Sequence, residues 1–140
     1  MGIVNRIYIG VDLGEKRIGL AKSDSLGLMA SPIKTILRKN NSSDIDSILK
    51  FASDFGAQKI VVGMPVSMSG DPGNQARITS SFVNSLANQS HIPVRVQDER
   101  MSSVEAEALL RAAGKKPSRD KASVDSAAAA VILQRFLDTI

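Results

Sequence analysis

The sequence predicts an α/β fold, in which a five-stranded mixed sheet is flanked by four helices. Two observations lead to this fold class. Short apolar stretches separated by turn residues fill the N-terminal quarter of the chain, which is typical of a three-stranded antiparallel meander. Beyond it, apolar residues at helical spacing alternate with short apolar runs, which predicts parallel strands joined by right-handed crossovers. We expect a single domain over residues 1–140, without repeats or an interdomain linker.

The three meander strands are predicted over residues 6–11, 17–23 and 28–37. The first is β-branched and apolar, as a buried strand is. The second alternates apolar with small or polar residues, and the third is bent or begins at Pro32. Short turns that contain glycine separate the strands, so consecutive strands should pair in antiparallel fashion.

A helix is predicted to follow the meander, with Ser42 or Ser43 as its N-cap and Gly56 at its end. Its apolar residues recur at helical spacing and are Ile45, Ile48, Leu49, Ala52 and Phe55. The next stretch, residues 59–63, is short and apolar. This is the pattern of a central parallel strand that is covered on both faces.

Three more helices and one more strand complete the predicted order β-β-β-α-β-α-β-α-α. The second helix has an apolar face composed of Ile78, Phe82, Leu86 and Ala87. A fifth strand should occupy residues 93–96. A capping box formed by Ser102 and Glu105 opens a third helix through Ala113, and a last helix is predicted over residues 122–138.

The composition excludes several classes of chemistry. The chain has no cysteine and a single histidine, His91, which excludes disulfides, thiol catalysis, zinc sites built on cysteine and histidine clusters. No apolar run reaches the roughly 18 residues that a membrane helix needs. Asp12 and Glu15 stand where a signal peptide would have its apolar core, so we expect a cytoplasmic protein.

Basic residues are concentrated in residues 111–121, which carry five basic side chains and one acid in a chain of net charge +4. The basic residues are Arg111, Lys115, Lys116, Arg119 and Lys121. The stretch is either a solvated loop or a loop that contacts phosphates, because nucleic-acid affinity comes mainly from lysine and arginine near the backbone. The scarcity of aromatic residues argues against base stacking and favours structured or duplex nucleic acid.

Three acidic residues are candidates for catalysis. Asp12 lies between Gly10 and Gly14 at the end of the first strand, Glu99 follows the fifth strand, and Asp125 is expected in the first turn of the last helix. Each also has a plainer interpretation: Asp12 as a turn residue, Glu99 as a surface acid, and Asp125 as an acid favoured by the helix macrodipole.

Together the three carboxylates favour a metal site. The ends of the first and fifth strands and the start of the last helix can converge at one edge of the sheet. Carboxylate oxygens suit Mg²⁺ or Mn²⁺, and two such ions can hydrolyse a phosphodiester without help from cysteine or histidine. We therefore predict that Asp12, Glu99 and Asp125 bind two divalent cations and form the catalytic set of a hydrolase.

Four segments resemble, in order, the motifs of the RuvX family, which is also called YqgF. They are GVDLGEKRIGLAKSD, VVGMPVSMSGDPGNQA, QDERMSS and VDSAAAAVILQRFLD, and they span nearly the whole chain. The resemblance implies a ribonuclease H-like fold, related to that of the RuvC junction resolvases. It implies a nuclease that resolves Holliday junctions or processes the 5′ end of pre-16S ribosomal RNA. It also implies Asp12, Glu99 and Asp125 as the metal-binding acids, with Arg17 and Arg100 as phosphate contacts.

Three functions remain open on the sequence. Cleavage of pre-rRNA, for ribosome biogenesis, is favoured over resolution of branched DNA in recombination and repair. Symmetric junction cleavage needs a dimer, but the apolar faces of the predicted helices are all needed for the predicted core, so we expect a monomer or weak homodimer. We expect it to bind nucleic acid and no membrane. The third possibility is a nucleic-acid-binding module without catalysis. An actin-like or sugar-kinase-like ATPase is excluded by length, since such enzymes use two copies of the fold.

Overall fold

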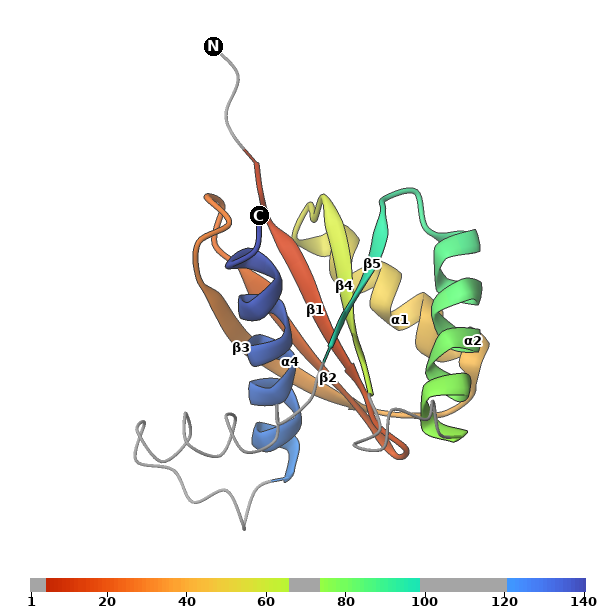
Figure 1. Ribbon diagram of the computed structural model, residues 1–140. Coiled ribbons are helices and arrows are strands. Elements are labelled where there is room, and N and C mark those ends of the chain that lie inside the picture. Colours follow the sequence, from red (N-terminus) through yellow and green to blue (C-terminus); the bar gives the residue numbers. More distant parts are fainter. Residues whose placement is uncertain (1–4, 66–73, 99–120) are drawn as a thin grey trace.

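The protein has a three-layer α/β architecture in the computed structural model, which describes residues 5–65, 74–98 and 121–140. A five-stranded sheet of order β3-β2-β1-β4-β5 forms the middle layer. Helices α1 and α2 cover one face of the sheet and α4 covers the other (Figure 1). The elements are β1 Tyr8–Leu13, β2 Arg17–Ser23, β3 Ala30–Leu37, α1 Asn41–Asp54, β4 Lys59–Met64, α2 Asn74–Gln89, β5 Val94–Asp98 and α4 Lys121–Leu137. The predicted mixed sheet is confirmed.

The sheet combines the two predicted kinds of pairing. β1 pairs with β2, and β2 with β3, in antiparallel fashion. β4 joins β1 and β5 in parallel, so the carboxyl ends of these three strands lie at one edge of the sheet. The predicted irregularity of the third strand is a register shift, at which Ala21 of β2 pairs with Pro32 of the edge strand β3. An edge strand tolerates a proline, which lacks a backbone N–H.

The alternation of side chains along β1 and β2 separates two unlike cores. Ile9, Val11 and Leu13 of β1 join Ile18 and Leu20 of β2 in the large cluster beneath α1 and α2. The intervening positions of both strands therefore face α4. They hold Tyr8, Gly10, Asp12, Arg17, Gly19 and Ala21.

Helix α4 lies unusually close to the sheet because the facing residues are small. A β-carbon added at Gly10 would come within 2.6 Å of the carbonyl oxygen of Ala129, and one added at Gly19 would overlap the carbonyl of Asp125. Ala129 and Ala130 of α4 are buried together with Ala21 of β2 at this contact. The backbone of α4 therefore rests directly on β1 and β2.

The N-cap of the first helix differs from the prediction. Ser42 and Ser43 lie inside α1, and the cap is Asn40, whose Oδ1 accepts a hydrogen bond from the backbone N–H of Ser43 at 2.8 Å. Asparagine and serine are about equally good caps, so local preference could not choose between neighbouring candidates. The predicted end is confirmed, since Gly56 adopts a left-handed φ of 64° just beyond the helix.

The second helix is rotated relative to the predicted apolar face. Phe82 and Leu86 are buried as expected, but Ile78 is 45% exposed and Ala87 is also exposed. Thr79 is buried in their place. The helix packs along the row formed by Thr79, Phe82 and Leu86, whose three- and four-residue steps lie on one side of a helix.

The last predicted helix lies within the described residues, while the helix and the basic stretch predicted before it do not. The last helix is confirmed with bounds shifted by one residue. The helix predicted from Ser102 through Ala113 and the basic stretch up to Asp120 lie outside the described residues. Among the helices that the structure describes, none is long and apolar enough to cross a membrane.

Candidate active site

Asp12 lies on the α4 face of the sheet. It is the fifth residue of β1, and it shares that strand's face with Gly10, which packs against α4. Its partner across the β1–β2 ladder is Gly19. The backbone carbonyl of Asp125 packs against the same Gly19 from the α4 side of the sheet. Asp12 and Asp125, which are far apart in the sequence, therefore meet around a single glycine.

Asp125 enters this site from the second turn of α4. The helix begins at Lys121, so the predicted position in the first turn is wrong. The effect of the helix macrodipole falls off within the first turn, which weakens it as the reason for an acid at this position. Ala128, Ala129 and Ile132, which lie on the same side of α4 as Asp125, are buried.

Arg17 forms an ion pair with Asp125. Its Nε donates a hydrogen bond to Oδ2 of Asp125 at 2.7 Å, and the two side chains are 30% and 25% exposed. Arg17 is the first residue of β2, and its side chain lies on the α4 face with Gly19 and Ala21. A cavity of about 220 Å³ opens beside the pair and is lined by Gly14, Glu15, Lys16, Arg17 and Asp125.

The hairpin that carries Arg17 is held in place by two residues that the sequence analysis missed, Arg38 and Asp44. Arg38 Nη1 donates to the carbonyl oxygen of Gly14 at 3.1 Å, and its Nε donates to Oδ2 of the buried Asp44 at 3.1 Å. The N–H of Gly14 also donates to the carbonyl of Arg17 at 2.9 Å, which closes the turn. The available signal was that Asp44 stands four residues before Ile48, which places an acid on the apolar face of α1, where it needs a partner.

The other predicted site residues fall outside the described part of the chain. They are Glu99, Arg100, Lys115, Lys116 and Arg119. Asp98, the last residue of β5, is described and exposed, and it lies at the carboxyl edge of the sheet beside Met64 of β4. Within residues 5–65, 74–98 and 121–140, no group of three acidic or histidine side chains could hold a metal ion.

The chemistry of the described pair nevertheless suits a hard cation. Asp12 and Asp125 offer carboxylate oxygens, and Gly19, which pairs with Asp12, lets the backbone of Asp125 approach the sheet closely. Mg²⁺ and Mn²⁺ prefer oxygen donors, and they complete their coordination with water and phosphate. Two carboxylates from different elements, one of which lines an open cavity, fit such an ion.

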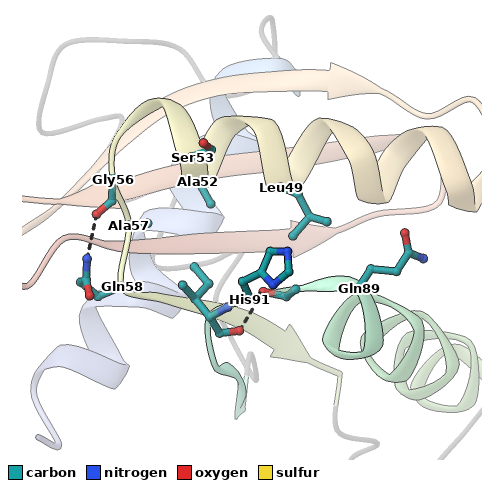
Figure 2. A pocket seen from close by; sticks show the side chains of 10 residues that line it. Leu49, Ala52, Ser53, Gly56, Ala57, Gln58, Gln89 and His91 are labelled. Carbon is teal, nitrogen blue, oxygen red and sulfur yellow. Dashed lines mark hydrogen bonds between the residues drawn. The ribbon is translucent and has the colours of Figure 1, made fainter.

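A second, larger cavity has a different character. It has a volume of about 330 Å³ and lies where α1 leads into β4 and α2 leads into β5, at the amino ends of these strands (Figure 2). Leu49, Ala52, Ala57 and Ile92 supply its apolar lining, and His91 stands at its rim. No carboxylate is among the described residues that line it. His91 is exposed.

Comparisons with known proteins agree with the fold and with the motifs. The family model described as "RuvX: Holliday junction resolvase" matches residues 6–139. A protein of Synechococcus sp. named "Putative pre-16S rRNA nuclease" is 41% identical over 130 residues, covering 93% of this chain and 87% of the relative. A relative of the same name from Chloroflexus aurantiacus is 39% identical, covering 96% of this chain and 88% of the relative.

Solved structures show the same architecture at low sequence identity. RuvC of T. thermophilus in complex with a Holliday junction substrate superposes with a TM-score of 0.60 at 16% identity, covering 96% of this chain and 95% of that one. The Fowlpox virus resolvase in complex with Holliday junction DNA gives a TM-score of 0.57 at 11% identity, covering 95% and 97%. These likenesses confirm the ribonuclease H-like fold that the motifs implied. Because the family model matches almost from end to end, and relatives about 40% identical cover nearly the whole chain, this protein belongs to the RuvX family.

Proposed function

We propose that this protein is a metal-dependent nuclease that hydrolyses phosphodiester bonds in structured nucleic acid. One observation carries the proposal: Asp12 of β1 pairs with Gly19, the backbone of Asp125 in α4 packs against the same glycine, and Asp125 lines an open cavity together with Arg17. The carboxylates of Asp12 and Asp125 can bind cations, and the guanidinium of Arg17 can bind a phosphate.

In this proposal the acids hold the metal and the bases hold the substrate. Asp12 and Asp125, with Glu99 as the predicted third acid, would bind Mg²⁺ or Mn²⁺. Two such ions supply an activated water and stabilise the leaving oxygen of the phosphodiester. Arg17 is the candidate phosphate contact among the described residues, because it lines the cavity and its guanidinium is paired with Asp125 at the border of that cavity.

The basic residues beyond the described part of the chain extend the same proposal. Arg100, Lys115, Lys116 and Arg119 would contact the nucleic-acid backbone, whose phosphates dominate affinity. Such contacts are independent of base sequence. They suit a substrate that is recognised by its shape, such as a folded precursor RNA or a branched DNA.

The favoured substrate is pre-16S ribosomal RNA, processed at its 5′ end in the cytoplasm. Support comes from relatives about 40% identical that bear the name "Putative pre-16S rRNA nuclease". Holliday junction DNA is the second candidate. The family description and the RuvC complex favour it, although the RuvC similarity is at 16% identity and concerns the fold alone. A non-catalytic binding module is the third possibility.

A side-by-side cleavage assay tests the proposal. The protein is incubated with pre-16S RNA and with a four-way DNA junction, each with and without Mg²⁺ or Mn²⁺. We expect metal-dependent cleavage of the RNA. We expect Asp12→Asn to abolish cleavage while leaving RNA binding largely intact, because the variant loses a metal ligand and keeps the basic residues.

Asp46→Asn is the matched control, since Asp46 is an exposed acid on α1, on the other side of the sheet from α4. It should cleave like the wild type. Cleavage by Asp12→Asn at the wild-type rate would exclude the metal role of this residue. Preferential cleavage of the junction would make Holliday junction DNA the favoured substrate in place of pre-16S RNA. RNA binding without cleavage of either substrate would favour the non-catalytic binding module.

A further inference from the structure

The Arg17–Asp125 ion pair uses one of the carboxylates on which the proposed metal site depends. The donated hydrogen bond of 2.7 Å places a permanent positive charge directly on Oδ2 of Asp125. A divalent cation at the same carboxylate would be repelled by that charge. Guanidinium and metal ion therefore compete for Asp125.

The two partners of the pair differ in freedom. The backbone of Asp125 is pressed against Gly19, and the backbone of Arg17 is tied into the hairpin through its carbonyl. The arginine side chain, in contrast, is long and 30% exposed, and it borders the cavity of about 220 Å³. Arg17 can thus move its guanidinium without any change in the fold, while Asp125 stays in place.

We propose that Arg17 is a positioning residue that couples cation binding to phosphate binding. Without a cation, its guanidinium neutralises Asp125. When the carboxylate is taken by a divalent cation, Arg17 turns into the cavity and becomes available to a phosphate of the substrate. The inference rests on the proposed function, and it adds that the nuclease holds back its phosphate-binding arginine until the metal is present.

Coupling of this kind has two measurable consequences. Arg17 weakens the binding of cations to the free protein, because the ion pair must first be broken. Cation and nucleic acid also strengthen the binding of each other, because thermodynamic coupling between two ligands is reciprocal. Both effects should vanish when Arg17 is replaced by a neutral residue.

The first test measures Mn²⁺ binding to the free protein by isothermal titration calorimetry. We expect Arg17→Gln to bind Mn²⁺ roughly two- to fivefold more tightly than the wild type, the range for losing a partly exposed ion pair. Lys16→Gln is the matched control. It removes the same charge from the same cavity, but Lys16 does not contact Asp125 in the described ion pairs.

Each outcome of this titration decides something. An equal gain in Lys16→Gln and Arg17→Gln would mean that general charge alone weakens cation binding, and it would overturn the inference. So would an unchanged or weaker affinity in Arg17→Gln. The wild type should also bind Mn²⁺ in a way that Asp12→Asn abolishes. If it does not, the metal site itself is excluded, and the coupling with it.

The second test measures the coupling directly. Fluorescence anisotropy gives the affinity for a labelled, phosphorothioate-substituted RNA stem-loop with and without Mn²⁺. We expect Mn²⁺ to raise the affinity of the wild type several-fold more than that of Arg17→Gln. Arg17→Lys, which keeps the charge, should retain part of the effect. Equal enhancement in the wild type and in Arg17→Gln would overturn the coupling even if the metal site stands.

Discussion

The two faces of the sheet are built from side chains of very different size. Beneath α1 and α2, residues such as Ile9, Ile18 and Leu86 are fully buried, and they hold the helices away from the strands. Beneath α4, glycine and alanine let the helix backbone touch the sheet. The first face supplies most of the apolar core. The second brings a helix residue, Asp125, within reach of a strand residue, Asp12.

This contrast between the two faces indicates where in the fold a ligand-binding or catalytic site can form. The large interlocking side chains beneath α1 and α2 form a closely packed core, and the cavity on that side lies at the amino ends of the strands with no carboxylate among the described residues that line it. On the α4 face, the close approach ends at the hairpin between β1 and β2, where a charged pair borders an open cavity. Stability and catalysis should therefore respond differently to changes on the two faces.

The largest expected effect is on stability, from the α1 and α2 face. Leu86 is fully buried in the main core, so Leu86→Ala should lower the free energy of unfolding by about 2–5 kcal/mol. The Mn²⁺ affinity of the molecules that remain folded should not change. Urea denaturation and calorimetry below the melting temperature measure the two quantities.

Ser85→Ala is the control for this variant, because Ser85 is an exposed neighbour on the same helix. It should unfold like the wild type. A large loss of Mn²⁺ affinity in Leu86→Ala would show that the two faces are not independent.

A smaller loss of stability, with a larger effect on the site, is expected on the α4 face. The added β-carbon in Gly19→Ala would overlap the carbonyl of Asp125, so the helix must move outward. Such overpacking costs about 1–3 kcal/mol. Mn²⁺ binding and cleavage should both fall, in contrast to Leu86→Ala. Wild-type Mn²⁺ affinity in Gly19→Ala would mean that the close approach of α4 does not position Asp125.

The smallest expected effect is on the pH dependence of stability, and it concerns the turn between β2 and β3, which contacts α4. Asp24 accepts hydrogen bonds from the backbone N–H groups of Leu28 and Met29 through Oδ1, and these bonds lower its pKa. Gln134 of α4 holds the same turn by donating to the carbonyl of Leu28. The charged form of Asp24 is therefore favoured in the folded state.

A lowered pKa stabilises the fold above the ordinary pKa of aspartate, and this contribution is lost as the pH falls through the lowered value. We expect Asp24→Asn to be slightly less stable than the wild type at pH 7, with the difference vanishing in strong acid. Thermal unfolding between pH 7 and pH 2 checks this. A difference that stays constant over that range would exclude the ionised carboxylate as its source.

Local pattern sufficed for much of the fold. The bounds of β2, the end of α1 at Gly56 and the division into meander and crossovers follow from alternation, helical spacing and glycine. Pattern failed where several neighbours were equally suitable. Asn40 caps α1 instead of a serine, and α2 turns Ile78 outward, because the packing of a whole helix outweighs the preference of one residue.

For the candidate site, the residues identify the chemistry but not its geometry. Without cysteine, and with one histidine, the chain had to use carboxylates and bases, and Asp12, Arg17 and Asp125 were recognisable from their motifs. The pairing of Arg17 with Asp125 and the support of the hairpin by Arg38 and Asp44 join separate elements. The contacts of Arg38 connect the hairpin with α1. The contact between Arg17 and Asp125 depends on how closely α4 and the sheet approach each other. That distance is set by the shape of the small residues packed between them, which no local pattern records.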